Sequence, residues 1–144
     1  MDISSDVTID APPEKVWAVL TDFAAYPSWN PFIEKLQGST PLAVGGHLTA
    51  TIHAPGKKAM TFTPEILAAE PDRELRWLGT VVHRSIFAGE HRHLLEPAGD
   101  GRTHYVQSEH FSGILVPFLK GTVRAAALGF AEMNAALKAR VEAS

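Results

Sequence analysis

The chain has 144 residues, with 13 Lys and Arg against 16 Asp and Glu, and a formal net charge of −3. This balance offers no basic field for phosphates, so a nucleic-acid partner is not expected, and no apolar run approaches the roughly 20 residues of a membrane-spanning helix. Cysteine is absent, which excludes disulfides and thiolate chemistry.

The first thirty or so residues predict a strand followed by short helices. Residues 2–10 alternate between apolar and polar side chains, as a half-buried strand does. Residues 10–13 are typical of a helix start, and the apolar stripe within 16–20 predicts a short helix. The segment 26–32 contains two prolines and is expected to be kinked. The N-terminus lacks the basic and apolar runs of a signal peptide, so we expect a cytoplasmic protein.

The middle of the chain predicts a run of strands and the tail predicts one long helix. The strands are expected at 47–54, 59–69, 73–80, 84–96 and 102–115. Short turns between them imply an antiparallel meander. After Pro117, apolar residues recur at helical spacing over about six turns. We therefore predict one α+β domain, residues 1–144, in which a curled antiparallel sheet of about seven strands packs on the C-terminal helix and leaves internal volume.

Several stretches also resemble a known family. They are APPEKVWAVLTDFAAYPSWNPFI, GGHLTATI, EPDRELRW, GEHRHLLEP, SEHFSGILVP and GFAEMNAALKARVE. Over residues 3–142 the chain resembles the START-like superfamily, and within it the bacterial polyketide cyclase/dehydrase and lipid-transport type. The resemblance implies the helix-grip fold: a seven-stranded sheet, with two short helices after the first strand, wrapped on the C-terminal helix around a cavity. Functions in the superfamily include lipid and hormone binding and aromatic ring closure, so the fold alone does not fix the activity.

A polar cluster is predicted on one face of the last two strands. If Leu95 pairs with Tyr105, then His93 opposes Gln107 and His91 opposes Glu109, and opposed residues share a face. The resembled family usually has aromatic or aliphatic residues at the positions of His93, Leu95 and Tyr105, which suggests that this face points inward. A register slip of one residue would turn the whole set outward.

The cluster has three alternative roles. Its groups can satisfy one another, they can orient a ligand, or Glu109 with His91 or His93 can act as an acid–base pair. The three residues are also formally a His₂-carboxylate set, but two histidines at this spacing arise often by chance, and no metal site is expected. The histidines at 47, 53, 104 and 110 fall on the opposite parity and are expected in solvent, and His83 is expected in a turn.

The predicted ligand site combines this cluster with apolar walls. Its ligand-binding residues are Trp77, His91, His93, Tyr105, Gln107, Glu109, Phe111, Phe62, Trp29, Asn30 and Phe130. Further apolar wall residues are Leu48, Ala50, Ile52, Met60, Leu75, Leu95 and Val123. In the resembled family the kinked segment lies near the cavity mouth, where its aromatic residues can either gate the cavity or plug the end of the barrel.

The leading hypothesis is a carrier or sensor that binds a small hydrophobic or amphipathic molecule: a lipid, isoprenoid, polyketide or aromatic metabolite. The first alternative is a cofactor-free polyketide cyclase or dehydratase that uses the Glu/His pair, and the second is an interaction module with a filled interior. No cofactor is expected, because the chain has neither a dinucleotide fingerprint nor a Walker sequence. The expected partner is the small ligand alone, without nucleic acid or membrane insertion, and the chain is expected to be a monomer or homodimer.

Overall fold

The computed structural model describes residues 1–38 and 41–144. In these ranges the helical elements are α1 (Pro13–Leu20), the 3-10 turn η1 (Phe23–Ala25), α2 (Tyr26–Trp29), the 3-10 turn η2 (Val116–Phe118) and α3 (Lys120–Glu142). The strands are β1 (Asp2–Ile9), β2 (Ile33–Gly38), β3 (Leu48–Ile52), β4 (Met60–Phe62), β5 (Glu65–Glu70), β6 (Glu74–Val81), β7 (Phe87–Pro97) and β8 (Thr103–Ser112). The α+β class and the long C-terminal helix are confirmed.

The strands form two antiparallel sheets, which corrects the predicted single sheet of seven strands. Five strands follow the order β1-β8-β7-β6-β5, and three follow the order β2-β3-β4. The stretch 59–69, predicted as one strand, is interrupted between Phe62 and Glu65, because Pro64 cannot donate to a sheet ladder. An isolated bridge between His47 and Glu65 joins the two sheets at this corner. The strand β2 has no counterpart among the predicted strands.

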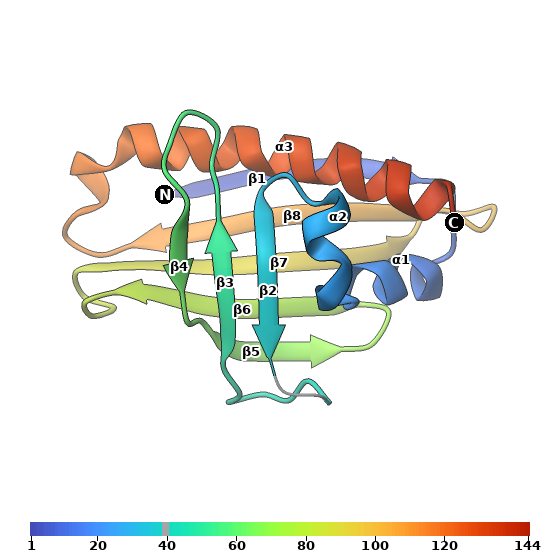
Figure 1. Ribbon diagram of the computed structural model, residues 1–144, viewed down its shortest axis with the longest axis horizontal. Coiled ribbons are helices and arrows are strands. Elements are labelled where there is room, and N and C mark those ends of the chain that lie inside the picture. The colour runs from blue at the N-terminus through green and yellow to red at the C-terminus, as the bar shows by residue number, and fades with distance from the viewer. Residues whose placement is uncertain (39–40) are drawn as a thin grey trace.

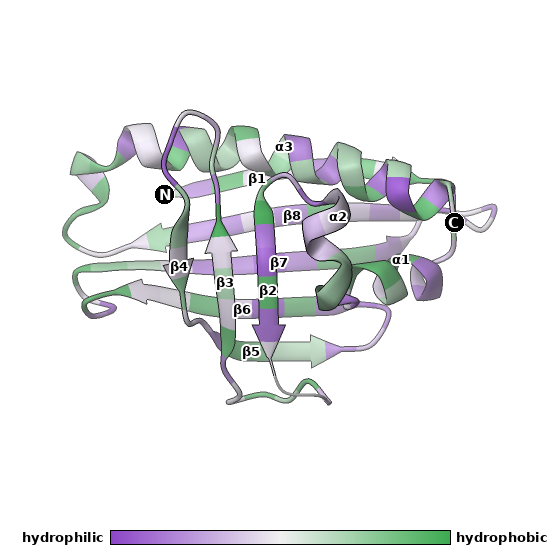
Figure 2. Ribbon diagram, viewed as in Figure 1, coloured by the Kyte–Doolittle hydropathy of each residue, from purple (hydrophilic) through white to green (hydrophobic). Residues whose placement is uncertain are grey.

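Helix α3 lies along β1, and the three-stranded sheet crosses in front of the five-stranded one (Figure 1). Green and purple segments alternate along α3, as expected for a helix with one apolar face (Figure 2). Its buried residues include Val123, Phe130, Leu137 and Val141, all from the predicted stripe. The core therefore lies between the two sheets and this face of the helix.

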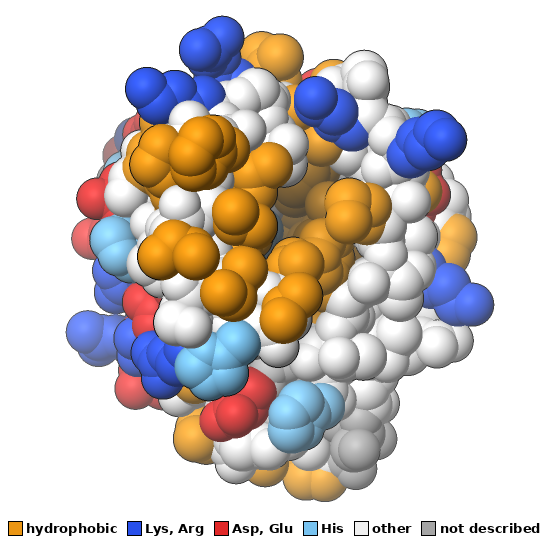
Figure 3. All heavy atoms as spheres, turned by 90° about the vertical axis from the view of Figure 1, so that its left-hand side faces the viewer, with side chains coloured by type: hydrophobic (Ala, Val, Ile, Leu, Met, Phe, Trp, Pro, Cys, Tyr) orange, Lys and Arg blue, Asp and Glu red, His pale blue; other side chains and the backbone are white. Residues whose placement is uncertain are grey.

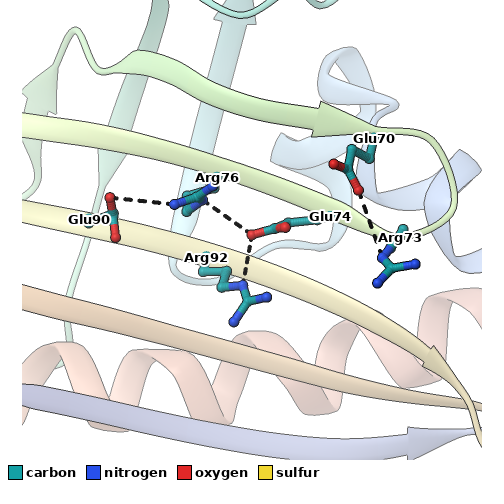
Figure 4. Close-up of polar contacts among 6 residues, drawn as sticks. All are labelled: Glu70, Arg73, Glu74, Arg76, Glu90 and Arg92. Atoms are coloured by element: carbon teal, nitrogen blue, oxygen red, sulfur yellow. Dashed lines mark hydrogen bonds and ion pairs between the residues drawn. The ribbon is translucent and has the colours of Figure 1, made fainter.

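The outer face of the five-stranded sheet carries charge, which identifies the opposite face as the inner one. The Glu74 carboxylate accepts a hydrogen bond from Arg92 Nε at 2.7 Å and lies 3.2 Å from Arg76 Nε, and Arg76 also pairs with Glu90 (Figure 4). These residues have even numbers on β6 and β7. The odd positions of the same strands therefore face the interior.

The histidines expected in solvent lie on this outer side or in loops, as predicted. His53, His104 and His110 are each paired with a carboxylate at the surface, and His47 is exposed. His83 lies in the turn between β6 and β7, where its Nδ1 meets the Ser85 hydroxyl at 2.8 Å.

Candidate functional site

A cavity of about 130 Å³ opens at one end of the molecule, between the inner face of β6, β7 and β8, the β3–β4 hairpin and the first turns of α3. Three segments surround its mouth: residues 53–64, 80–87 and 113–124, which we call the mouth segments. Viewed from this end, the surface shows a hollow bordered by hydrophobic side chains (Figure 3). The interior is therefore not solidly packed, and the filled interior expected of a pure interaction module is not observed.

The strand register of the β7–β8 hairpin is the predicted one. Leu95 pairs with Tyr105, His93 with Gln107 and His91 with Glu109. Because these positions face inward, His91 and His93 are 2% and 0% exposed. Their imidazole rings stack on each other with centroids 4.6 Å apart, and both rings also contact Trp77.

A chain of hydrogen bonds fixes the proton on one nitrogen of His91. The Gln107 amide nitrogen donates to Asn134 Oδ1 at 2.9 Å, so the Gln107 oxygen faces His91 Nε2 at 2.8 Å and accepts a hydrogen bond from the N–H group there. The remaining nitrogen, His91 Nδ1, lies 3.4 Å from Glu109 Oε1. The imidazole of His91 and the carboxylate of Glu109 are therefore adjacent at the cavity wall.

His93 belongs to a second, more deeply buried contact. Its Nδ1 lies 2.5 Å from the Tyr105 hydroxyl, and its Nε2 is buried without a hydrogen-bond partner among the described residues. Burial, together with the neighbouring His91, holds the pKa of His93 well below its usual range. Burial likewise raises the pKa of the Tyr105 phenol. Both groups therefore stay neutral near neutral pH and form part of the packing behind the cavity wall.

Gly89 makes room for the Glu109 carboxylate. A Cβ atom at position 89 would overlap Glu109 Oε2 and would lie 3.0 Å from Glu109 Cδ. The carboxylate therefore lies over the backbone of β7, and its side chain is 15% exposed toward the cavity. Glu109 is thus both paired with His91 and within reach of a bound molecule.

The cavity contains some of the predicted ligand-binding residues and not others. Those that line it are Phe62, Trp77, His91, Glu109 and Phe111, together with Ile52 and Met60 from the predicted wall. The residues outside the lining are His93, Tyr105, Gln107, Phe130, Leu48, Ala50, Leu75, Leu95 and Val123. The latter are buried beside or beyond the cavity, because the core continues past its closed end.

Trp29 and Asn30 are also outside the lining, since the kinked segment lies away from the mouth (Figure 1). The Asn30 oxygen accepts hydrogen bonds from the backbone N–H groups of Phe32 and Ile33, which holds the segment in a tight turn. Phe32 then projects against the cavity wall and packs edge-on against Phe130, with ring centroids 5.5 Å apart. Of the kinked segment, Phe32 therefore contributes to the cavity wall, whereas Trp29 and Asn30 do not.

Several lining residues were not predicted. They are Phe32, Ala54, Lys57, Lys58, Pro64, Gly79, Thr80, Val81, Phe87, Gly89, Thr122 and Ala126. Gly79 and Gly89 are opposed across β6 and β7, and glycines in the middle of strands are the one sequence signal that could have indicated close approach. The loop residues carry no such signal.

Within residues 1–38 and 41–144, no three His, Asp or Glu side chains lie close enough together to hold a metal ion. The ring nitrogens of His91 and His93 that have partners face Gln107, Glu109 and Tyr105 rather than one shared point.

Comparison with known proteins decides the family. A family model described as "Polyketide cyclase / dehydrase and lipid transport" matches residues 1–142. The chain belongs to this family. No curated protein matches the chain in sequence. In the part of the chain that the structure describes, no helix combines the length and the apolar character needed to cross a bilayer.

Solved structures of members of this broad fold superimpose over nearly the whole chain. The Zhui aromatase/cyclase from Streptomyces sp. R1128 gives a TM-score of 0.79 at 15% identity, covering 99% of this chain and 93% of that one. A START superfamily protein from Mycobacterium smegmatis gives 0.74 at 22% identity, covering 98% and 97%. Norcoclaurine synthase from Thalictrum flavum, solved with dopamine and hydroxybenzaldehyde, gives 0.72 at 17% identity, covering 98% and 86%. At these identities the likeness establishes the fold alone.

Proposed function

We propose that this chain binds a small, largely apolar, ring-containing molecule in the cavity, as a carrier or sensor. The observation that carries the proposal is the arrangement of the lining: apolar and aromatic side chains enclose the His91–Glu109 pair, which supplies the ionisable groups beyond the mouth. Sites for small molecules combine such walls with a few polar groups that orient the ligand. The aromatase/cyclase and norcoclaurine synthase likenesses are compatible with a ring-containing ligand.

The cavity volume limits the size of the enclosed part of the ligand. A cavity of about 150 Å³ lined by apolar side chains holds one benzene ring. The 130 Å³ found here therefore encloses about one ring, and a second ring would lie toward the mouth. A longer ligand would extend through the mouth.

The polar pair selects for a hydrogen-bond donor on the ligand. Glu109 accepts hydrogen bonds when ionised, so a phenolic hydroxyl or an amine would be held there, whereas a ligand carboxylate would be repelled. His91 lies four residues along β7 from Phe87 at the mouth, a distance of about 13 Å for a strand. The donor would thus enter first, and any acidic group would remain at the mouth beside Lys57 and Lys58.

Isothermal titration calorimetry with naphthalene, 2-naphthol and 2-naphthoate tests this selectivity. We expect 2-naphthol to bind best and 2-naphthoate worst. Glu109→Gln should reduce the preference for 2-naphthol over naphthalene about tenfold to a hundredfold, which is the value of one charge-assisted hydrogen bond of about 1.5–3 kcal/mol. The matched control is Glu90→Gln on the outer face of β7, which should leave the series unchanged. Equal binding of all three compounds by the parent protein would refute the proposed role of Glu109.

The second candidate is a cofactor-free cyclase or dehydratase, favoured by the adjacent imidazole of His91 and carboxylate of Glu109 on the cavity wall. Their 3.4 Å separation is longer than a catalytic hydrogen bond of about 2.6–3.2 Å, but such contacts commonly tighten only when substrate binds. Catalysis predicts that conversion of a poly-β-ketone probe to its aromatic product exceeds the rate in buffer and is lost in Glu109→Gln while binding persists. A carrier shows no such acceleration in either protein.

A further inference from the structure

Large apolar side chains are exposed around the cavity mouth. Val82 is 91% exposed, Phe118 81%, Ile114 67% and Met60 53%. They belong to all three mouth segments, and Figure 3 shows hydrophobic side chains gathered around the hollow. Side chains of this size and exposure, clustered at one end of a molecule, mark an interaction surface.

The mouth segments form one continuous rim. The backbone N–H groups of Ile114 and Leu115 donate to the carbonyls of Ser85 and Ile86, both at 3.0 Å, which joins 113–124 to 80–87. The Lys57 ammonium lies 3.9 Å from the place that a Cβ atom of Gly121 would occupy, which joins 53–64 to the start of α3. The exposed apolar residues therefore share one surface.

This rim is strongly basic although the whole chain is acidic. The mouth segments contain Lys57, Lys58, Arg84, Lys120 and Arg124 and no Asp or Glu, whereas the chain has a net charge of −3. All five side chains are exposed. Helix α3 also begins here without an acidic residue in its first turn. The rim is thus complementary to a negatively charged surface.

Val82 is held in an unfavourable backbone conformation at the rim. Its φ is 68°, and the His83 N–H donates to the Val81 carbonyl at 2.8 Å, so Val82 is the central residue of a strained γ-turn. A β-branched residue is an outlier in this region, where glycine or asparagine is usual. Neither packing nor backbone preference accounts for valine here, since the side chain is almost fully exposed.

We propose that the rim docks on an anionic lipid bilayer, with Val82, Ile114 and Phe118 inserted among the lipid headgroups and the lysines in contact with anionic lipid. A bilayer is the partner that this rim suits, because its apolar side chains come from separate loops around the mouth of an apolar cavity and stand among basic side chains. Insertion of apolar side chains combined with attraction of basic ones is how peripheral proteins bind such surfaces. The mouth would then face the acyl region, and an apolar ligand could pass without entering water. This transfer of a ligand between bilayer and cavity rests on the proposed function, but the docking itself does not.

Flotation with vesicles tests the docking in the whole chain. We expect the protein to float with vesicles of equal phosphatidylcholine and phosphatidylglycerol and to remain unbound with phosphatidylcholine alone. The double variant Lys57→Gln, Lys58→Gln should lower the partition coefficient about 30-fold, since each basic residue near an anionic surface contributes about one kcal/mol. Phe118→Ser should lower it about tenfold or more.

Matched variants control for charge and apolar exposure elsewhere. Arg102→Gln with Arg140→Gln removes two exposed cations outside the rim, and Val44→Ser removes an apolar side chain that is 69% exposed in another loop. Neither of these control variants should change flotation. The rim variant Val82→Asn should weaken flotation without lowering the melting temperature. If the parent protein does not float, the proposal is overturned and an acidic protein becomes the better candidate partner. If the parent floats but the rim variants float equally well, the proposal is overturned too. Glu109→Gln should float like the parent, which separates a failure of docking from a failure of the proposed ligand site.

Discussion

Replacing Gly89 by alanine should displace the Glu109 carboxylate without unfolding the protein. The new methyl group would overlap Glu109 Oε2 and lie 3.0 Å from Cδ and 3.5 Å from Cγ. Because the clash is with the end of a flexible side chain, Glu109 can rotate away. It then loses its contact with His91 Nδ1, which lies 3.4 Å from Glu109 Oε1 in the parent protein. A rotamer change costs about 0.5–1.5 kcal/mol, and alanine regains about 0.5–1 kcal/mol over glycine in a strand, so stability should stay within about 1 kcal/mol.

The expected functional result is a change in selectivity. Losing a charge-assisted hydrogen bond of about 1.5–3 kcal/mol should reduce the preference for 2-naphthol over naphthalene tenfold to a hundredfold. Gly79 is the control, because it is paired with Gly89 across the strands and a Cβ atom there meets nothing within 4 Å. Gly79→Ala should weaken both compounds alike by filling cavity space. If calorimetry shows that Gly89→Ala keeps the parent's preference, Glu109 does not orient the ligand from the position described.

Three further predictions concern stability. Gly129→Ala should destabilise the protein by about 1–3 kcal/mol in urea unfolding, since the added methyl would overlap the Phe32 ring in the core. Gly121→Ala should be neutral or stabilising, because a Cβ atom there meets only the Lys57 ammonium, at an ordinary contact distance of 3.9 Å, and equal effects of the two changes would contradict this packing. Because the pKa of buried His93 is lowered, the folded protein resists its protonation, so stability should fall as pH drops below about 6.5, the value for an unfolded chain. In unfolding experiments at successive pH values, His93→Gln should show a shallower fall than the parent, and identical slopes would exclude His93 as the cause. Val82→Asn should raise the free energy of unfolding by about 1 kcal/mol by relieving the positive φ, and a loss of stability would show that Val82 packs where the structure has it exposed.

The period of two was sufficient to predict which side chains of the β7–β8 hairpin share a face, and the family resemblance indicated that this face points inward. Once Leu95 was paired with Tyr105, the opposition of His91 and Glu109 followed, and the structure has this register. The same periodicity could not reveal the corner at Pro64, where the chain leaves one sheet for the other. A pattern of apolar residues continues across such a corner although the hydrogen-bonding partner changes.

The extent of the cavity could not be predicted for a different reason. Tyr105, Gln107 and His93 share the inner face with His91, yet they lie outside the lining, because the core closes over them. Where a core closes depends on how side chains from distant segments meet, such as Phe32 against Gly129, and strand parity contains no information on this. For the same reason the mouth segments, which are mostly loops, carried no signal for their position.

Three features that lower the stability of the fold lie together at this cavity and its rim. Their shared location is the reason to connect them with the proposed function. Val82 is strained and exposed, Gly89 lies within a strand, and Glu109 is largely withdrawn from water beside an imidazole. The other residues with positive φ outside glycine, Asp72 and Asp100, lie in tight turns, where aspartate adopts this conformation readily. A domain selected for stability alone would have asparagine or glycine at 82, a larger residue at 89 and an apolar one at 109. Gly89 and Glu109 set the room and the polarity of the cavity and Val82 lies at its rim, so the ligand binding and the docking proposed above would account for all three.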